Sequence, residues 1–276
     1  SVVAGVRAQA PQITLDDVQG VTDRADEAAD DFFRRSREIR LRFHYQDRFL
    51  TDRDREQMAQ WARPAGETLA RAAATLSDFS RRIEAYEGDD WDRRFGVTGL
   101  WRRAHTSAER FARLACRVDY WWALTLEDAA RDKRLADVIA RCAAHAGGEE
   151  DPAVCLLRAQ CLSRLTNDPT ARDQASQCLA EVLEAYRSER RPPNAAYFHA
   201  AIARLGLLDR VDATLIREVL TALQRTALAD DLDILLRLAF LELRGTRPRS
   251  DRVLQEVLRR SPSAAPFVGR VVLDAV

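Results

Sequence analysis

The sequence lacks several features that would assign a function directly. It has no run of about 18 apolar residues, so it contains no conventional membrane-spanning segment. It has no P-loop, no GxSxG motif and no GxGxxG turn after a predicted strand, which are the usual signatures of nucleotide binding and serine hydrolysis. Lys133 is the only lysine among 43 basic residues, and 43 acidic residues balance them. Because the two signs are interspersed, no excess positive charge is available, and we expect no nucleic-acid partner.

Histidine is also scarce and scattered. None of the four histidines belongs to an HExxH motif or to a similar ligand spacing. They are His44, His105, His145 and His199. We therefore expect no metal site, no cofactor and no catalytic residue.

Cysteine is present in an odd number, which cannot be paired completely within one chain. No CxxC or CxxCH motif occurs, so thioredoxin-like, zinc-ribbon and c-type haem sites lack their signature. The five cysteines are Cys116, Cys142, Cys155, Cys161 and Cys178. We predict that most of them are small buried apolar side chains.

The first third of the chain carries apolar and small residues at regular 3-4 spacing, which predicts long amphipathic helices. The first stripe comprises Leu15, Val18, Thr22, Ala25, Ala29, Phe32, Ser36, Ile39 and Phe43. The second comprises Met58, Ala62, Ala65, Leu69, Ala72, Leu76, Phe79, Ile83 and Tyr86. The third comprises Trp101, Ala104, Ala108, Phe111, Ala115, Val118 and Trp122. Helices of this kind should pack as a long antiparallel hairpin within a three-helix, coiled-coil-like bundle over residues 14–130.

Two details of the second stripe can be predicted more closely. Thr51 or Asp52 can provide the N-cap of its helix. Pro64 interrupts the stripe without changing its spacing, so either the helix kinks there or a new helix begins with Pro64 in its first turn.

From about residue 131 the pattern changes to shorter amphipathic helices separated by turn signals. Breaks fall at residues 146–152, 166–169, 188–194, 207–212, 228–231, 244–251 and 261–266. Alternate breaks recur at Pro152, Pro193, Asp231 and Pro262, with spacings of 41, 38 and 31 residues. Such spacings are typical of two-helix repeats, so residues 131–276 are predicted to form a short α-solenoid. The predicted fold class is therefore all-α.

The segment AAYFHAAIARLG at residues 195–206 resembles the first helix of a tetratricopeptide-type repeat. Its small residues Ala196, Ala200, Ala203 and Gly206 fit that family's pattern, whereas the Trp/Tyr and closing Pro positions of the family are not kept consistently. The resemblance is confined to residues 131–276. It implies right-handed stacking of helical hairpins and says nothing about a particular ligand.

One segment between predicted helices, EGDDWDRRFGVTGLWRRAHT at residues 87–106, concentrates Trp, Arg and Asp. It can be a structural corner, in which Gly88 ends the second helix, Asp89 or Asp90 caps the following turn, and aromatic rings fold over the end of the bundle. It can instead be a ligand pocket. The candidate contact residues are Trp91, Arg93, Arg94, Trp101 and Arg102, with Arg103 as a further anion donor and Asp90, Asp92 and His105 as the residues that catalysis would add. The corner is the preferred prediction.

Two functional hypotheses follow. The first is a non-catalytic interaction or scaffold protein with a helical-repeat surface for protein partners, in which the N-terminal helices could also form a homo-oligomer. The alternative is a ligand-binding protein or enzyme with a pocket near residues 87–105, where the bundle meets the solenoid.

The first residues leave a separate question open. Residues 1–13 are predicted to be a flexible terminus or the remnant of a signal peptide, because Ala8-Gln9-Ala10 has the form of a signal-peptidase site. This slightly favours an exported or cell-envelope protein over a cytoplasmic one.

Overall fold

The long apolar stripes are helical in the computed structural model, which describes residues 10–44, 50–144, 151–189, 192–208, 213–229, 231–243, 255 and 258–259. These residues contain helices and no strand, which confirms the predicted all-α class. The helices are α1 (Leu15–Arg35), α2 (Arg37–His44), α3 (Asp52–Glu84), the π-helix η2 (Asp92–Gly96), α4 (Leu100–Ala123), α5 (Asp128–Ala144), α6 (Pro152–Leu162), α7 (Ala171–Ser188), α8 (Ala195–Leu207), α9 (Ala213–Gln224) and α10 (Leu232–Leu243). Residues 1–9, His145 and the predicted breaks at 244–251 and 261–266 lie outside the described residues.

The chain divides into two compact units. Unit 1 comprises Ser1–Arg37 and Glu56–Thr125, and it therefore holds α1, most of α3, η2 and α4. Unit 2 comprises Glu38–Arg55 and Leu126–Val276, and it holds most of α2 together with α5 to α10.

The first apolar stripe is divided between two helices. α1 ends at Arg35, and Ser36, which is completely buried, donates its backbone N–H to the carbonyl of Phe32 before α2 begins. A single continuous helix through residue 43 was therefore the wrong expectation. Leu15, the first member of the stripe, is 39% exposed, whereas Phe32 is 1% exposed. Apolar spacing alone indicates the helical period but does not show where a helix ends.

Every residue of the second stripe except Tyr86 lies on one unbroken helix, α3, with Pro64 in its interior. The alternative of a new helix starting at Pro64 was wrong. Thr51 is the N-cap: its hydroxyl accepts the backbone N–H of Asp54 at 3.2 Å, and the Asp54 carboxylate accepts the backbone N–H of Thr51 at 3.0 Å. This reciprocal pair satisfies two donors that the first helical turn cannot satisfy internally.

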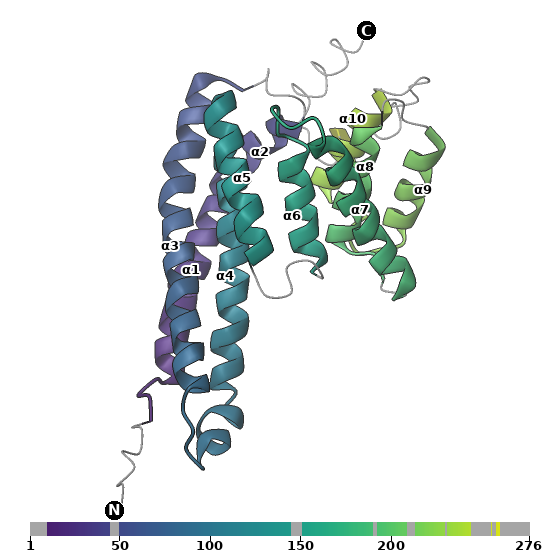
Figure 1. Cartoon of the computed structure of the whole chain (residues 1–276). Helices are drawn as coiled ribbons and strands as arrows, with labels where there is room; N and C mark the ends of the chain where they lie inside the picture. The colour runs from purple at the N-terminus through teal and green to yellow at the C-terminus, as the bar shows by residue number, and fades with distance from the viewer. Residues whose placement is uncertain are drawn as a thin grey trace, which may run out of the picture. The chain divides into compact units, whose positions relative to one another are not determined.

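Contacts within unit 1 define the directions of its three long helices, which lie lengthwise beside one another in Figure 1. Arg110 pairs with Asp26, and two helical turns further along both helices Arg117 lies over the ring of Phe33 at 5.4 Å, so α1 and α4 run parallel. Between α3 and α4 the order reverses. Arg63 lies 5.3 Å from the ring centre of Trp122, and at the other end Glu84 accepts from Trp101, so α3 is antiparallel to α4.

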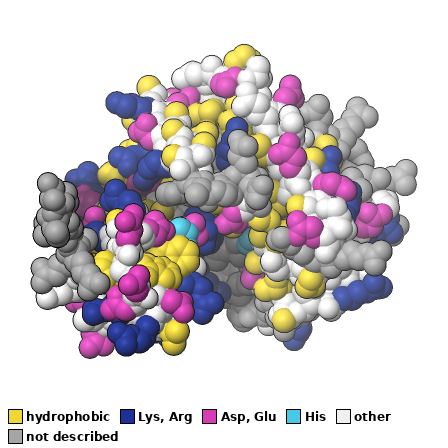
Figure 2. Space-filling model, turned by 60° about the horizontal axis from the view of Figure 1, so that its bottom comes forward, with side chains coloured by type: hydrophobic (Ala, Val, Ile, Leu, Met, Phe, Trp, Pro, Cys, Tyr) yellow, Lys and Arg dark blue, Asp and Glu magenta, His cyan; other side chains and the backbone are white. Residues whose placement is uncertain are grey.

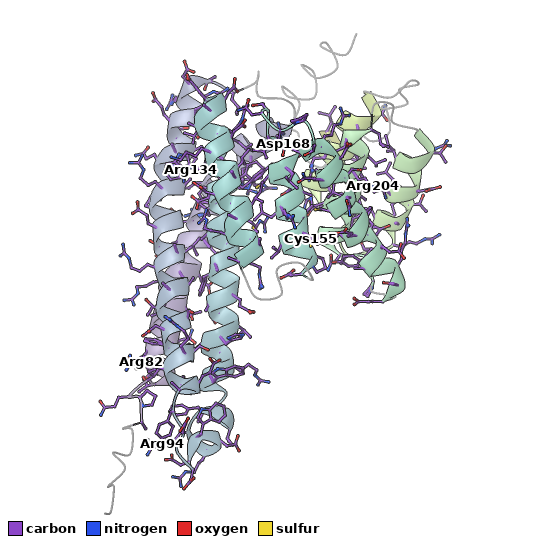
Figure 3. The ribbon with its side chains drawn as sticks, in the orientation of Figure 1. Arg82, Arg94, Arg134, Cys155, Asp168 and Arg204 are labelled. Carbon is purple, nitrogen blue, oxygen red and sulfur yellow. The ribbon has the colours of Figure 1, made fainter. Side chains whose placement is uncertain are left out.

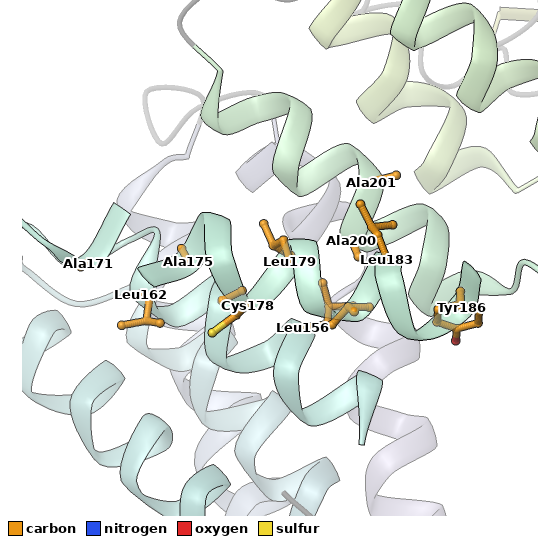
Figure 4. Packing of buried hydrophobic residues seen from close by; sticks show 12 residues of the cluster. Leu156, Leu162, Ala171, Ala175, Cys178, Leu179, Leu183, Tyr186, Ala200 and Ala201 are labelled. Atoms are coloured by element: carbon orange, nitrogen blue, oxygen red, sulfur yellow. The ribbon is translucent and has the colours of Figure 1, made fainter. Parts of the chain in front are cut away.

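Unit 2 consists mainly of shorter helices in which neighbours along the chain pack against each other. One buried core joins α6, α7 and α8, as Figure 4 shows for residues such as Leu156, Leu179 and Ala200. A second core joins α8, α9 and α10 around Phe198 and Leu238. α8 contributes to both cores and contacts both α6 and α10.

A buried carboxylate connects α5 to the turn between α6 and α7. Asp132, 8% exposed, accepts the backbone N–H of Thr166 at 3.2 Å and its hydroxyl at 2.7 Å. Because both donors face the same carboxylate, the burial of this charged group is compensated by hydrogen bonds.

Candidate functional site

The candidate site is the segment that connects α3 to α4 in unit 1. α3 ends at Glu84, and the chain then passes through a single π-helical turn, η2, before α4 begins at Leu100. The backbone N–H of Val97 donates to the carbonyl of Asp92 at 2.7 Å and closes this turn. Gly99, with φ of 68°, is the N-cap of α4, and this left-handed conformation favours a residue without Cβ. The π-helical turn was not predicted from the sequence.

Two details of the predicted corner were wrong. Gly88 does not end α3, which stops at Glu84. Gly88 instead lies against Tyr86, because a Cβ at this position would come within 2.1 Å of the tyrosine hydroxyl. Neither aspartate caps the turn, since the residue at the start of η2 is Trp91 and no side chain caps it.

Three aromatic rings form the interior of the segment. Phe95, 3% exposed, packs edge-on against Tyr86 at 5.9 Å and against Trp91 at 6.3 Å between ring centres. The indole N–H of Trp91 donates to the carbonyl of Ile83 at 2.9 Å. Trp91 is therefore bound to the last turn of α3, and its polar atom is already used inside the protein.

Asp90 links the aromatic cluster to the arginines. Its carboxylate accepts the Tyr86 hydroxyl at 2.8 Å and the Nε–H of Arg94, and Arg93 Nη2 lies 3.8 Å away. The hydrogen bond from Tyr86, followed by that from Arg94, lowers the pKa of Asp90 below its usual value of 3.8. Figure 3 shows Arg94 on this segment, beyond the end of α3. The Nε–H of Arg94 is occupied by its hydrogen bond to Asp90, although the Arg94 side chain is 51% exposed.

Trp101 connects the two helices that the segment joins. Its indole N–H donates to Oε1 of Glu84, the last residue of α3, at 2.8 Å. Its ring stacks on His105 with ring centres 5.1 Å apart and an interplanar angle of 15°. His105 Nε2 in turn lies 3.4 Å from Oε1 of Glu109. Trp101 is only partly buried, so it covers the helix end without being enclosed in it.

Arg102 differs from the other four candidates. It is exposed at the start of α4, and within the described part of the chain its guanidinium forms no hydrogen bond or ion pair. Arg103 beside it is also exposed, and the first turn of α4 contains no acidic residue. Arginines near a helix N-terminus oppose the helix dipole, so these two contribute little to the stability of α4.

The five predicted contact residues thus separate into two groups. Trp91 directly precedes η2 and Arg93 and Arg94 belong to it, whereas Trp101 and Arg102 belong to the first turn of α4. The residues that catalysis would require do not form an acid–base pair: His105 faces Glu109, and Asp90 is held by Tyr86 and Arg94. Among the described residues no three His, Cys, Asp or Glu side chains are placed to bind a metal ion.

Two residues that organise this segment were not predicted from the sequence, Tyr86 as a donor and Glu84 as an acceptor. The spacing Tyr86, Asp90, Arg94 places one residue every four positions, which could have suggested the Asp90 contacts. No comparable signal exists for Glu84 and Trp101, which are 17 residues apart on different helices.

A second polar contact lies in unit 2 and was also not predicted. Arg237 Nη1 of α10 lies 2.8 Å from His199 Nδ1 of α8, and the two residues are 38 positions apart. Both side chains are half-buried. This contact joins two helices that share the second core of unit 2.

No family model, curated protein or solved structure matches the chain. None of the helices within the described residues combines the length and apolar content that a membrane crossing needs. Figure 2 shows basic and acidic side chains interspersed over one face of the molecule, in keeping with the equal numbers of the two signs.

Proposed function

We propose that the chain is a non-catalytic protein–protein interaction protein, in which a helical bundle in unit 1 accompanies a short, tetratricopeptide-like α-solenoid in unit 2. The observation that carries this proposal is the contact between His199 and Arg237, 38 residues apart on α8 and α10. The same interval separates Pro193 from Asp231, the breaks at which two successive repeats are predicted to begin. Contacts at the repeat interval are expected where equivalent helices of adjacent repeats stack.

The two cores of unit 2 support the same proposal. Tyr197 and Val219 lie against both of them, so the cores adjoin at α8 and α9. Each helical hairpin therefore completes its burial against the next, as in a solenoid, where stacked repeats offer an extended surface to a partner.

The candidate site in unit 1 supports a structural role for most of its residues. Trp91, Arg94 and Trp101 each use a polar side-chain atom for an internal hydrogen bond. These three polar atoms are therefore not available to a ligand while the internal hydrogen bonds persist. The alternative function, ligand binding near residues 87–105, is favoured by one observation, the π-helical turn η2, because such turns are frequent at functional sites.

The test uses the 276-residue chain with a photo-crosslinking residue at exposed Glu181 of α7 in unit 2 and, separately, at exposed Arg71 of α3 in unit 1. A crosslinked protein is identified, purified and recombined with the chain, and binding is measured by titration calorimetry. We expect a protein partner to be crosslinked from position 181 and the purified partner to bind the chain with a defined stoichiometry. Failure of every candidate to bind the purified chain would contradict it.

Two further measurements address the other proposed partners and the alternative function. Light scattering on the purified chain tests a homo-oligomer. A metabolite thermal-shift screen tests the alternative. A ligand whose stabilising effect disappears in Arg102→Ala would favour a binding site at residues 87–105 over the interaction role.

A further inference from the structure

Two of the cysteines stand at matching positions on consecutive helices of unit 2. Cys155 stands seven residues before α6 ends at Leu162. Cys178 stands seven residues after α7 begins at Ala171. The two helices pack against each other and are joined by the short connection of residues 163–170, which makes them an antiparallel hairpin. Cys155 and Cys178 are therefore equally far from the connection and lie at the same level of the hairpin.

The spacing of buried residues places both cysteines on the faces through which α6 and α7 meet. Residues three, four and seven positions apart share one face of a helix. Each helix contributes three residues at this spacing, which are Cys155, Ala159 and Leu162 on α6, and Ala171, Ala175 and Cys178 on α7. All of them belong to the core that these helices share, although Cys155 packs against it from a partly exposed position. Figure 4 shows Cys178, Ala175 and Leu162 in this core.

Small side chains allow the two helices to approach closely at this face. Ala159 and Ala175 are completely buried in the shared core. The axes of packed helices lie about 8–10 Å apart and Cα atoms lie about 2.3 Å from the axis, so facing Cα atoms at one level are about 4–6 Å apart. A disulfide needs Cα atoms about 4.4–6.8 Å apart. A bond between Cys155 and Cys178 therefore fits the hairpin without separating its helices.

The electrostatics of Cys155 independently place α7 beside it. Burial raises the pKa of the Cys155 thiol above its usual value of 9.0, and the next largest contribution comes from Cys178. Glu181, which is also on α7, raises this pKa further. Such effects come from groups only a few ångströms away, so the thiol of Cys178 lies near that of Cys155.

The two thiols differ in their access to solvent. Cys155 is partly exposed, whereas Cys178 is buried, with 9% of its surface exposed. An oxidant in solution therefore reaches Cys155 first. Cys178 needs no contact with that oxidant, because it only has to reach the sulfur of Cys155.

We propose that Cys155 and Cys178 are a redox pair, which a small-molecule disulfide such as oxidised glutathione converts into a disulfide bond between α6 and α7. The thiolate of Cys155 attacks one sulfur of the oxidant and forms a mixed disulfide, while half of the oxidant leaves as a thiolate. The thiolate of Cys178 then attacks Sγ of Cys155 and displaces the other half. The two protein thiols lose two electrons and two protons in total, and the oxidant takes them up to become two thiols.

The bond fastens this hairpin in a redox-dependent way, and this role is independent of the proposed interaction function. A cross-link restricts the unfolded chain more than the folded one, so the oxidised protein should be more stable than the reduced protein. Because the pKa of Cys155 is raised, little thiolate is present at neutral pH and the first step should be slow. A thiol reductant reverses both steps and restores the two thiols.

The experiment incubates the reduced, folded 276-residue chain with oxidised glutathione, blocks the remaining thiols and maps the products by mass spectrometry without reduction. Trypsin and a glutamate-specific protease together place each cysteine on its own peptide, because cleavage after Glu149 separates Cys142 from Cys155. We expect the peptides of Cys155 and Cys178 to be linked. The melting temperature should rise by about 5–10 °C, and dithiothreitol should reverse the change.

Two variants test the order of the steps. Cys178→Ala should stop at the mixed disulfide, so glutathione should stay attached to Cys155. Cys155→Ala should leave Cys178 as a thiol, because this buried side chain does not meet the oxidant. Cys161→Ala is the matched control, since Cys161 is also on α6 but lies six residues after Cys155, about 240° around the helix. It should form the same bond as the unchanged protein, and circular dichroism checks that all three variants keep their helical fold.

Four results would overturn the proposal. An unmodified Cys155 would show that the oxidant does not reach it. Glutathione that stays on Cys155 of the unchanged protein, with Cys178 still a thiol, would show that the two sulfurs do not meet. A link from either residue to another cysteine would assign the pair wrongly, and a link between the two that lowers the melting temperature would show that the bond distorts the hairpin. None of these measurements involves a protein partner, so failure of the interaction function would leave the redox pair unaffected.

Discussion

Arg237 donates a hydrogen bond from Nη1 to Nδ1 of His199 at 2.8 Å, and this bond joins α10 to α8. Arg237 is the donor because a guanidinium has hydrogen-bond donors and no acceptor. The imidazole nitrogen of His199 must therefore accept. The neutral ring therefore carries its proton on Nε2. Nitrogen-detected NMR of labelled protein near neutral pH should show this tautomer for His199. A proton on Nδ1 would contradict the bond.

Phe32 and Phe79 belong to the first and second apolar stripes but differ in burial. Replacing each with alanine should therefore lower the stability of the protein by different amounts. Phe32 is 1% exposed, so Phe32→Ala should lower the free energy of unfolding by about 3–5 kcal/mol. Phe79 is only half-buried, so Phe79→Ala should cost clearly less. Urea unfolding measures both. Arg35→Ala is the control, because the exposed pair of Arg35 with Asp31 should contribute about 0–1 kcal/mol. Equal losses at all three positions would contradict the burial assigned to them.

Trp101 should matter more for stability than the arginines near it. Trp101→Ala removes the hydrogen bond to Glu84 and the stacking on His105, and we expect a loss of about 1–3 kcal/mol, below that of a fully buried aromatic residue because the side chain is partly exposed. Arg93→Ala should change stability by about 0–1 kcal/mol, since its side chain is 81% exposed. Chemical denaturation compares the two. A greater loss for Arg93→Ala would indicate that the arginine, not the tryptophan, secures the segment.

Because the pKa of Asp90 is lowered in the folded protein, the stability of the protein should change with pH in the acidic range. Hydrogen bonds from Tyr86 and Arg94 lower its pKa in the folded state below the usual 3.8. A carboxyl group with a lowered folded pKa contributes stability that is present above pH 3.8 and is lost as the pH falls through the folded pKa. Asp90→Asn should therefore be less stable than the unchanged protein at neutral pH, and this difference should shrink in acid. Asp89→Asn, an exposed neighbour, is the control; the same pH profile in both variants would count against the Asp90 contacts.

The cysteines should differ in reactivity. Cys155 is partly exposed and the other four are buried, and all five are present as thiols. Burial raises the pKa of Cys155 above its usual value of 9.0, so little reactive thiolate is present at neutral pH. Iodoacetamide should modify Cys155 slowly in the folded protein and the buried cysteines only in denaturant, as peptide mass spectrometry would show. Rapid modification of Cys161 in the folded protein would be inconsistent with its burial.

Local periodicity made much of the helical structure predictable. Val18, Ala25, Ala29 and Phe32 were assigned to one face by spacing alone, and all four are buried. Thr51, one of the two N-cap candidates, is the N-cap, and the burial of most cysteines was also predicted correctly. These predictions depend on residues within a few turns of one another or on the side chain's own hydrophobicity.

The candidate site could be predicted only in part. Its position between two helices and its aromatic character were evident, whereas the π-helical turn and the central place of Asp90 were not. A π-turn differs from an α-turn in the backbone hydrogen bonds that it forms, and the sequence of η2 carries no periodic signal that separates the two. The predicted caps failed because Asp90 has stronger partners in Tyr86 and Arg94 than in the backbone.

The sequence by itself determined that this protein is helical. Apolar residues at 3-4 spacing share one face in a helix, and no alternating runs are present that would share one face in a strand. Tertiary structure decided which residues meet. Ser36 ends α1 from a fully buried position, Glu84 accepts from Trp101, and Arg237 reaches His199 across 38 residues. Such pairs depend on how helices are brought together in space, and the spacing of residues along one helix contains no information about its neighbour's register.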